Sequence, residues 1–288
     1  MSEQALDIAT PSGKNSTNEN FPVGSLLIRP ELRPHVHAFY RFARMADDIA
    51  DNPALEPGDK IRRLDLMEAV LLDAAREDVP EAADIRRSLK ATGLSPVNCT
   101  DLLIAFRMDA TKQRYADWNE LMTYCRYSAS PVGRQLLDLH GEGPEARGPS
   151  DALCVALQVI NHLQDCGVDY VEMDRVYVPQ DHMVANGVEL GHLRAKTASA
   201  GLRRTLNSLL DETDRLMLEA RNLPANLKDF RLRCESATIV RLAFSMIGEL
   251  RRHDPLAKRV KPTKLAFALA ALQGIAWSCC AGARRSRR

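Results

Sequence analysis

The stretches DDIAD (Asp47–Asp51) and NHLQDCGVD (Asn161–Asp169) decide the fold class of this chain. Each contains two aspartates four residues apart, a spacing that places both carboxylates on the same face of an α-helix. One polar stripe is then formed by Tyr40, Arg44, Asp47 and Asp51. A second is formed by Gln158, Asn161, His162, Asp165 and Asp169.

Apolar residues flank both stripes. Phe39, Phe42 and Ile49 are among those around the first. Around the second are Leu157 and Val168 on one side and Val159 and Cys166 on the other, with Ile160 and Leu163 behind. An ordinary surface helix has one apolar stripe and a broad polar face, so the pattern here is reversed. It predicts two mostly buried helices whose carboxylates face a cavity or each other. Unpaired carboxylates in such a place are costly, and a bound divalent metal would remove that cost.

Helical periodicity continues along most of the chain, with proline and glycine between the periodic segments. It predicts helices over 34–51, 59–77, 81–92, 96–115, 118–140, 150–169, 189–221 and 225–252. The one strand-like run is Arg175–Pro179. We therefore expect a single all-α domain over residues 21–260, preceded by a flexible tail over 1–20 without the features of a signal peptide.

The amino-acid composition argues against several functional classes of protein. A formal net charge of +1 indicates no dedicated nucleic-acid surface, and 45% hydrophobic residues suffice for a substantial core. The seven cysteines contain no CxxC pair. They predict reduced thiols in a cytoplasmic protein, not a disulfide framework or a zinc site.

The C-terminal segment, 261–288, combines a nearly continuous apolar run over Leu265–Trp277 with a basic end at Arg284, Arg285, Arg287 and Arg288. The run is shorter than the roughly 18–20 residues of a membrane-spanning helix. Two interpretations remain open. The segment forms a final helix packed on the bundle, or it lies in a membrane interface with its arginines on anionic lipid.

From about Phe21 to Arg259 the chain resembles the squalene/phytoene synthase family of prenyl synthases. The resemblance rests on both aspartate motifs and on 39–44, Met108-Asp109, Arg114-Tyr115, 124–133, Gln158, Tyr170 and 175–179. Within that family it is most similar to the branch that forms hydroxysqualene in bacterial hopanoid biosynthesis. That similarity rests on 20–23, 124–134, 137–141, 161–166 and 251–257.

This resemblance implies a helical isoprenoid-synthase fold with a central apolar cavity flanked by the two Asp-rich helices. It implies that presqualene diphosphate and water give hydroxysqualene and diphosphate. The cofactor would be Mg²⁺, two or three ions bound with diphosphate, for which carboxylate and amide oxygens are suitable ligands. The expected metal ligands are Asp47, Asp51, Asp165, Asp169 and Asn161.

The remaining site residues are expected to handle the substrate. Diphosphate or substrate would be bound by Arg44, Gln158, Asn161, Arg175 and Tyr177. Catalytic roles would belong to Tyr127, Tyr40 and Arg44, since guanidinium suits diphosphate and tyrosine rings stabilise cations. Further expected partners are the membrane, contacted peripherally on its inner surface, and the enzyme that makes presqualene diphosphate.

Simpler roles stay open for several of these residues. Arg44 can pair with Asp47 one turn away, a tyrosine can simply pack, and His162 is expected to be a core histidine rather than a base. Asp48 points off the main stripe, where it either supports the metal ligands or has no part in the site.

Three departures from the wider family pattern fit a member that performs only the second half of squalene synthesis. They are Val168 where many members have Glu, Gln164 where many have Arg, and Ala129-Ser130 in place of an Ala-Gly pair. No Gly-rich dinucleotide fingerprint is present, which agrees with an alcohol product formed without NADPH. The rival functions are an enzyme that condenses two prenyl diphosphates and a non-catalytic helical binding or assembly protein.

Overall fold

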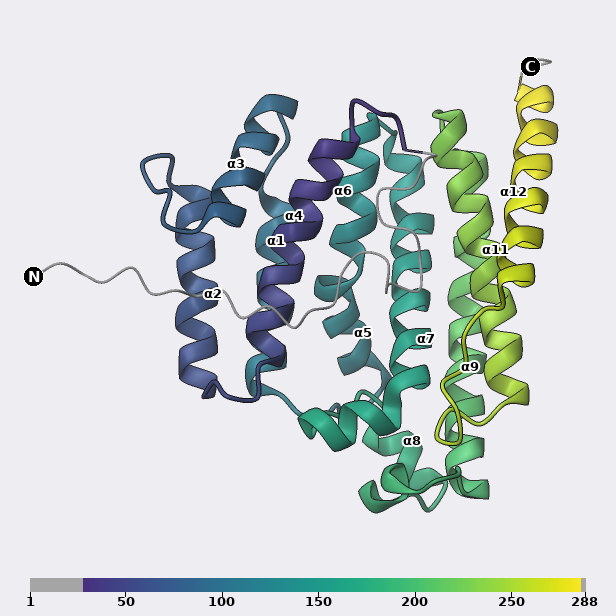
Figure 1. Cartoon of the computed structure of the whole chain (residues 1–288). Coiled ribbons are helices and arrows are strands. Elements are labelled where there is room, and N and C mark those ends of the chain that lie inside the picture. Colours follow the sequence, from purple (N-terminus) through teal and green to yellow (C-terminus); the bar gives the residue numbers. More distant parts are fainter. Residues whose placement is uncertain (1–27, 286–288) are drawn as a thin grey trace, which may run out of the picture. The chain divides into compact units, whose positions relative to one another are not determined.

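The computed structural model describes residues 28–285, apart from the side chains of 264–267 and 279–285. Contacts divide the chain into two compact units, Met1–Lys112 with Asp138–His140 and Gln113–Leu137 with Gly141–Arg288. Both consist of helices (Figure 1), so the predicted all-α class is confirmed. The tail predicted over 1–20 lies outside the described residues, and the predicted domain boundaries stay a prediction.

The first unit contains four helices, α1 (Arg33–Asp51), α2 (Pro57–Leu72), α3 (Pro80–Thr92) and α4 (Val97–Thr111). Helix α1 packs against the other three. Prolines occupy the first turns of α1, α2 and α3, where a missing N–H costs no hydrogen bond. The core of this unit contains fully buried side chains on all four helices, such as Phe42, Ile49, Leu64, Ile85 and Leu102.

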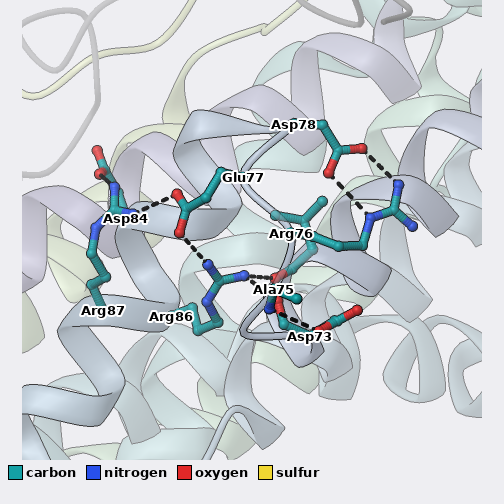
Figure 2. Close-up of polar contacts among 9 residues, drawn as sticks. Asp73, Ala75, Arg76, Glu77, Asp78, Asp84, Arg86 and Arg87 are labelled. Carbon is teal, nitrogen blue, oxygen red and sulfur yellow. Dashed lines mark hydrogen bonds and ion pairs between the residues drawn. The ribbon is translucent and has the colours of Figure 1, made fainter. Parts of the chain in front are cut away.

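Helix α2 ends before Asp73, so the prediction that it continues to Glu77 is wrong. A polar network holds the chain in a turn there, as Figure 2 shows. The carboxylate of Asp73 accepts a hydrogen bond from the N–H of Ala75 at 2.9 Å, and Glu77 pairs with Arg86 and Arg87 at 2.6 Å each. An aspartate that binds a nearby backbone N–H offers the chain an alternative to the helix, which explains the early end.

The second unit is built around the long helix α7 (Arg147–Met173), which packs against α5 (Trp118–Ser128), α9 (Ala200–Ala220) and α11 (Phe230–Arg252). Helix α6 (Ser130–His140) precedes α7, and its last three residues belong to the first unit. The other elements are η1 (Pro144–Ala146), α8 (Gln180–Ala185), η2 (Leu190–Arg194), α10 (Leu223–Asn226) and α12 (Lys264–Arg285).

Three predicted helices differ from the observed ones because of local signals. The helix predicted over 118–140 breaks at Ala129, since Pro131 cannot continue the preceding turn. The helix predicted over 189–221 begins only at Ala200, where the Ser199 hydroxyl accepts a hydrogen bond from the N–H of Leu202. Asp229 likewise caps α11, which starts five residues after the predicted start at 225.

Other predicted helix ends are also displaced. Helix α4 ends at Thr111 instead of 115, and α7 begins at Arg147 and continues to Met173 instead of spanning 150–169. The strand-like run Arg175–Pro179 forms a single parallel bridge, between Arg114 and Val176. All the cysteines whose side chains the structure describes carry free thiols, as predicted.

Helix α12 packs against α11, its neighbour in Figure 1. A search of the described residues finds no helix with the length and apolar character needed to cross a membrane.

Candidate active site

The first polar stripe lies on α1, and Tyr40, Arg44, Asp47 and Asp51 are all half-buried along it. Fully buried apolar side chains occupy both flanks, as the reversed pattern predicts. Arg44 forms an ion pair with Asp47 at 2.8 Å and a second, shorter one with Asp48. The guanidinium therefore places positive charge directly beside the carboxylates of this motif.

The second polar stripe lies on α7, where Gln158, Asn161, Asp165 and Asp169 are half-buried. The flank with Val159 and Cys166 is buried as expected, but Val168 on the other flank is 50% exposed, so the expectation of two buried flanks is wrong there. Asp165 forms an ion pair at 2.7 Å with Arg259, which comes from the segment between α11 and α12. Gln164, next to Asp165, is buried and donates a hydrogen bond to the backbone carbonyl of Val260. The chain after α11 is thus fixed along α7 beside the second aspartate motif.

A buried aromatic cluster adjoins this stripe within the second unit. Its members are Tyr115, Tyr124 on α5, His162 on α7, and Tyr177. The hydroxyls of Tyr124 and Tyr177 lie 3.3 Å apart, and the guanidinium of buried Arg175 donates to the Tyr177 hydroxyl at 3.2 Å. The predicted substrate residues Arg175 and Tyr177 are therefore brought together in a largely desolvated environment.

Backbone geometry explains how Arg175 and Tyr177 reach this cluster. Helix α7 ends at Met173, and the next residue, Asp174, adopts a left-handed conformation with φ of 51°. The chain then runs alongside Gln113, whose carbonyl accepts a hydrogen bond from the N–H of Val176 at 2.9 Å. This pairing holds an extended segment, in which successive side chains point to opposite sides. Arg175 and Tyr177 consequently share one side.

The imidazole of His162 stacks on the Tyr177 ring, with ring centroids 3.6 Å apart. Burial, with a smaller contribution from the positive charge of Arg175, lowers the pKa of His162 to about 3. The ring is therefore neutral near pH 7. Its Nε2 has no hydrogen-bond partner among the described residues. These observations favour the interpretation of His162 as a core histidine rather than a base.

Cys166 lies between the two aspartates of the second motif and is buried. Burial, with a smaller contribution from the negative charge of Asp169, raises the pKa of its thiol to about 12. The group is thus an uncharged thiol, which excludes it as a nucleophile at neutral pH.

The oxygen ligands of both motifs fit a hard divalent cation. Within the described part of the chain, no three His, Cys, Asp or Glu side chains form a group that could hold a metal by themselves. Mg²⁺ takes only one or two carboxylates in many sites and completes its shell with phosphate oxygens and water. Asp47 and Asp165 already face the cations Arg44 and Arg259, so each motif is built to accept positive charge.

Two residues of this region were missed by sequence reasoning. Tyr124 shares the buried face of α5 with Leu121 and Cys125, and this helical spacing was a signal that could have separated it from Tyr127. Tyr127 is half-buried, and the guanidinium carbon of Arg126 lies 5.7 Å from its ring centroid. Arg259 carries no such signal, because its partner Asp165 is 94 residues away along the chain.

The sequence profile of squalene/phytoene synthases matches residues 15–266. The chain belongs to the squalene/phytoene synthase family. It is thus a prenyl synthase family enzyme, as its two aspartate motifs predict, and the predicted isoprenoid-synthase fold is confirmed. Enzymes of this family act on prenyl diphosphates.

Relatives of known function match this family member over different shares of their length. The hydroxysqualene synthase of Rhodopseudomonas palustris is 46% identical over 259 residues, which cover 90% of this chain and 88% of the relative. That of Zymomonas mobilis is 46% identical over 270 residues, covering 91% of each. Phytoene synthase 1 of Solanum lycopersicum is 29% identical over 59% of this chain and 43% of its own length.

Solved structures of the family show the same fold. The squalene synthase HpnC of Alicyclobacillus acidocaldarius has a TM-score of 0.72 and 33% identity, covering 80% of this chain and 87% of that one. A dehydrosqualene synthase determined with a ligand has a TM-score of 0.75 at 24% identity. This likeness supports a shared fold and carries no argument about function.

Proposed function

We propose that this family member is a hydroxysqualene synthase, which converts presqualene diphosphate and water to hydroxysqualene and diphosphate. The observation that carries the proposal is 46% identity to hydroxysqualene synthases over about nine-tenths of both chains. In the proposed reaction the bond between carbon and the diphosphate oxygen breaks, and its electron pair leaves with diphosphate. The carbocation rearranges, the oxygen of a water molecule bonds to it, and that water releases a proton.

We propose Asp47 and Asp51 in one motif, and Asp165, Asp169 and Asn161 in the other, as the ligands of Mg²⁺. Bound there with diphosphate, Mg²⁺ would neutralise the charge that develops on the leaving group. The donor types and the half-buried position of both stripes support this assignment.

Arg44 and Arg175 are proposed to bind diphosphate oxygens, because a planar guanidinium matches their geometry. Arg44 pairs with two carboxylates in the absence of substrate, and it would exchange one of them for diphosphate. Arg175 is buried against the Tyr177 hydroxyl, which fixes the direction of its guanidinium. Gln158 and Asn161, half-buried on the polar stripe of α7, are proposed to contact the substrate.

Tyr177 is proposed to act through its hydroxyl, which accepts a hydrogen bond from Arg175 and lies 3.3 Å from the hydroxyl of Tyr124. Its ring is stacked with those of His162 and Tyr115, so its faces are already in contact with protein. Tyr40 and Tyr127 are proposed, on the strength of the family resemblance, to stabilise the carbocation through their ring faces. The large apolar cavity implied by that resemblance stays a prediction.

A second candidate function is the condensation of two farnesyl diphosphates to presqualene diphosphate or onward to squalene. Relatives named phytoene synthase and squalene synthase favour keeping it. Gln164 argues against condensation, because many condensing members have an arginine at this position. Here the buried amide donates a hydrogen bond to the backbone carbonyl of Val260. Incubation with farnesyl diphosphate, Mg²⁺ and no NADPH separates the two. We expect no consumption of farnesyl diphosphate, and formation of presqualene diphosphate would overturn the proposal.

The substrate is a poorly soluble diphosphate with long apolar chains, so its delivery matters. We propose that the protein works in the cytoplasm at the inner membrane surface. There it would receive presqualene diphosphate from the membrane or from the enzyme that makes it.

A further inference from the structure

Helix α12 packs on α11 through small residues and turns Leu269, Leu272 and Ile275 outward. Ala270, Gly274 and Ser278 are buried, and they recur every four residues along one face. A Cβ at Gly274 would lie only 2.8 Å from the backbone nitrogen of Thr238 on α11, so the two helices are in close contact there. Arg241 of α11 also donates a hydrogen bond to the side chain of Gln273 at 2.9 Å.

The opposite face of α12 carries an apolar stripe formed by Leu269, Leu272 and Ile275, which are 47%, 66% and 41% exposed. A helix that packs in water normally buries its leucines and exposes its small or polar residues. The reversed arrangement fixed by Gly274 leaves this stripe without a protein partner among the described residues. We call the three residues the outer face of α12.

Charge around the outer face indicates what covers it. Residues 255–288 contain eight lysines and arginines and no aspartate or glutamate. The cations lie on both sides of the apolar run, at Lys258, Arg259, Lys261 and Lys264 before it and at Arg284, Arg285, Arg287 and Arg288 after it. Two copies of such a surface would repel each other, whereas an anionic surface would attract it.

We propose that the outer face of α12 is a docking surface for an anionic lipid bilayer, on which the helix lies parallel to the membrane. Apolar side chains on one helix face with flanking cations are the combination that interfacial helices use. Trp277, half-buried near the end of the apolar run, is a residue type that gathers at membrane interfaces. The proposal combines the two interpretations of the C-terminus, because α12 packs on α11 through one face and would contact lipid with the other.

Vesicle flotation of the full-length protein tests the proposal, and it needs no substrate. The probes are vesicles of phosphatidylcholine containing about a quarter phosphatidylglycerol, an anionic lipid, and vesicles of phosphatidylcholine alone. We expect clear enrichment on the anionic vesicles, weakened by added salt because exposed charges are screened. Binding that does not differ between the two vesicle types would overturn the proposal.

Three variants locate the binding surface. L269Q/L272Q/I275Q should lower the partition coefficient by at least about tenfold, since partly exposed leucine and isoleucine side chains lose their burial in lipid. R284Q/R285Q/R287Q/R288Q should lower it by about fivefold for each charge near the surface. The control L72Q/V184Q/L218Q replaces three apolar side chains of α2, α8 and α9 that are 58%, 77% and 55% exposed, somewhat more than those of the outer face, and it should bind like the unmodified protein.

Circular dichroism and thermal unfolding check that the variants fold. If the triple variant of α12 does not, Leu272→Gln alone replaces its most exposed side chain and should still weaken binding about threefold. Vesicle binding unaffected by the folded variant would overturn the proposal. So would a dimer, measured by sedimentation without lipid, that the outer-face variant dissociates, because the face would then belong to a second copy. None of these outcomes bears on the proposed reaction, which is assayed separately with substrate in detergent.

Discussion

Replacing His162 by phenylalanine should change how the stability of the protein depends on pH. The ring is buried and stacked at 3.6 Å on Tyr177, and its pKa is lowered to about 3 from the ordinary 6.5. Phenylalanine keeps the aromatic stack and removes the titrating group. The comparison therefore isolates the free energy of keeping this histidine neutral.

The direction in which stability changes with pH follows from whether the folded or the unfolded protein binds the proton. Below pH 6.5 the unfolded chain takes up a proton on His162 that the folded protein refuses until the pH approaches 3. Stability linked to this residue is therefore fully present above pH 6.5 and is lost as the pH falls from about 6.5 towards 3. Between pH 7.5 and pH 5 the unmodified protein should lose about 2 kcal/mol more than the His162→Phe variant, at 1.36 kcal/mol per pH unit.

Urea unfolding followed by circular dichroism at both pH values, with EDTA present, measures this difference. His37→Phe is the control, since it replaces a half-buried histidine on α1 of the other unit. The two proteins are compared by the free energy of unfolding that each loses between pH 7.5 and pH 5. If these losses differ by less than about 0.5 kcal/mol, which is near the error of extrapolation, the reasoning is refuted. The histidine would then be protonated in the folded state or open to solvent.

Three further predictions concern the second unit. Arg259→Ala removes the cation paired with Asp165 and should tighten Mn²⁺ binding by about two- to fivefold, the range for a partly exposed ion pair. The binding is measured by electron paramagnetic resonance without diphosphate. Arg259→Lys keeps the charge, so its affinity for Mn²⁺ should stay near that of the unmodified protein. Asp165→Asn should weaken Mn²⁺ binding at least about tenfold in the same assay, because a charged ligand is lost, and unchanged binding would remove Asp165 from the metal site. Tyr177→Phe removes the acceptor of the hydrogen bond from Arg175 and should lower the free energy of unfolding in urea by about 1 kcal/mol, whereas Tyr127→Phe should leave it within about 0.5 kcal/mol.

Local sequence patterns predicted the elements whose signals are themselves local. The bounds of α1 and α3 follow from prolines at their starts and from Asn52-Pro53 and Gly93 at their ends. The early end of α2 was also marked locally, by Asp73, whose carboxylate binds the N–H of Ala75, whereas the ion pairs of Glu77 with Arg86 and Arg87 on α3 have no local signal. The break at Ala129 was visible in Pro131 and was overlooked.

The candidate site likewise contains features that local spacing predicts and contacts between distant residues that it does not predict. Helical spacing was enough to place the two aspartate stripes, because apolar neighbours on the same helix fix which face is polar. The link between Arg259 and Asp165 spans 94 residues and depends on how the chain returns after α11. The stack of His162 on Tyr177 likewise needs the left-handed turn at Asp174, a conformation that the sequence does not mark with a glycine.

The outward leucines of α12 could not be read from its sequence either. A nearly uniform apolar run does not say which face is buried. The close approach at Gly274 decides it, since the smallest residue permits contact with α11 and turns the larger side chains away.

Product analysis in ¹⁸O-labelled water tests the central claim most directly. The purified protein is supplied with presqualene diphosphate and Mg²⁺, without NADPH, and the extracted products are separated by gas chromatography and identified by mass spectrometry. The account predicts hydroxysqualene carrying one ¹⁸O atom, and no product when EDTA is present. Presqualene alcohol without label would show cleavage between phosphorus and oxygen, and it would contradict capture of a carbocation by water.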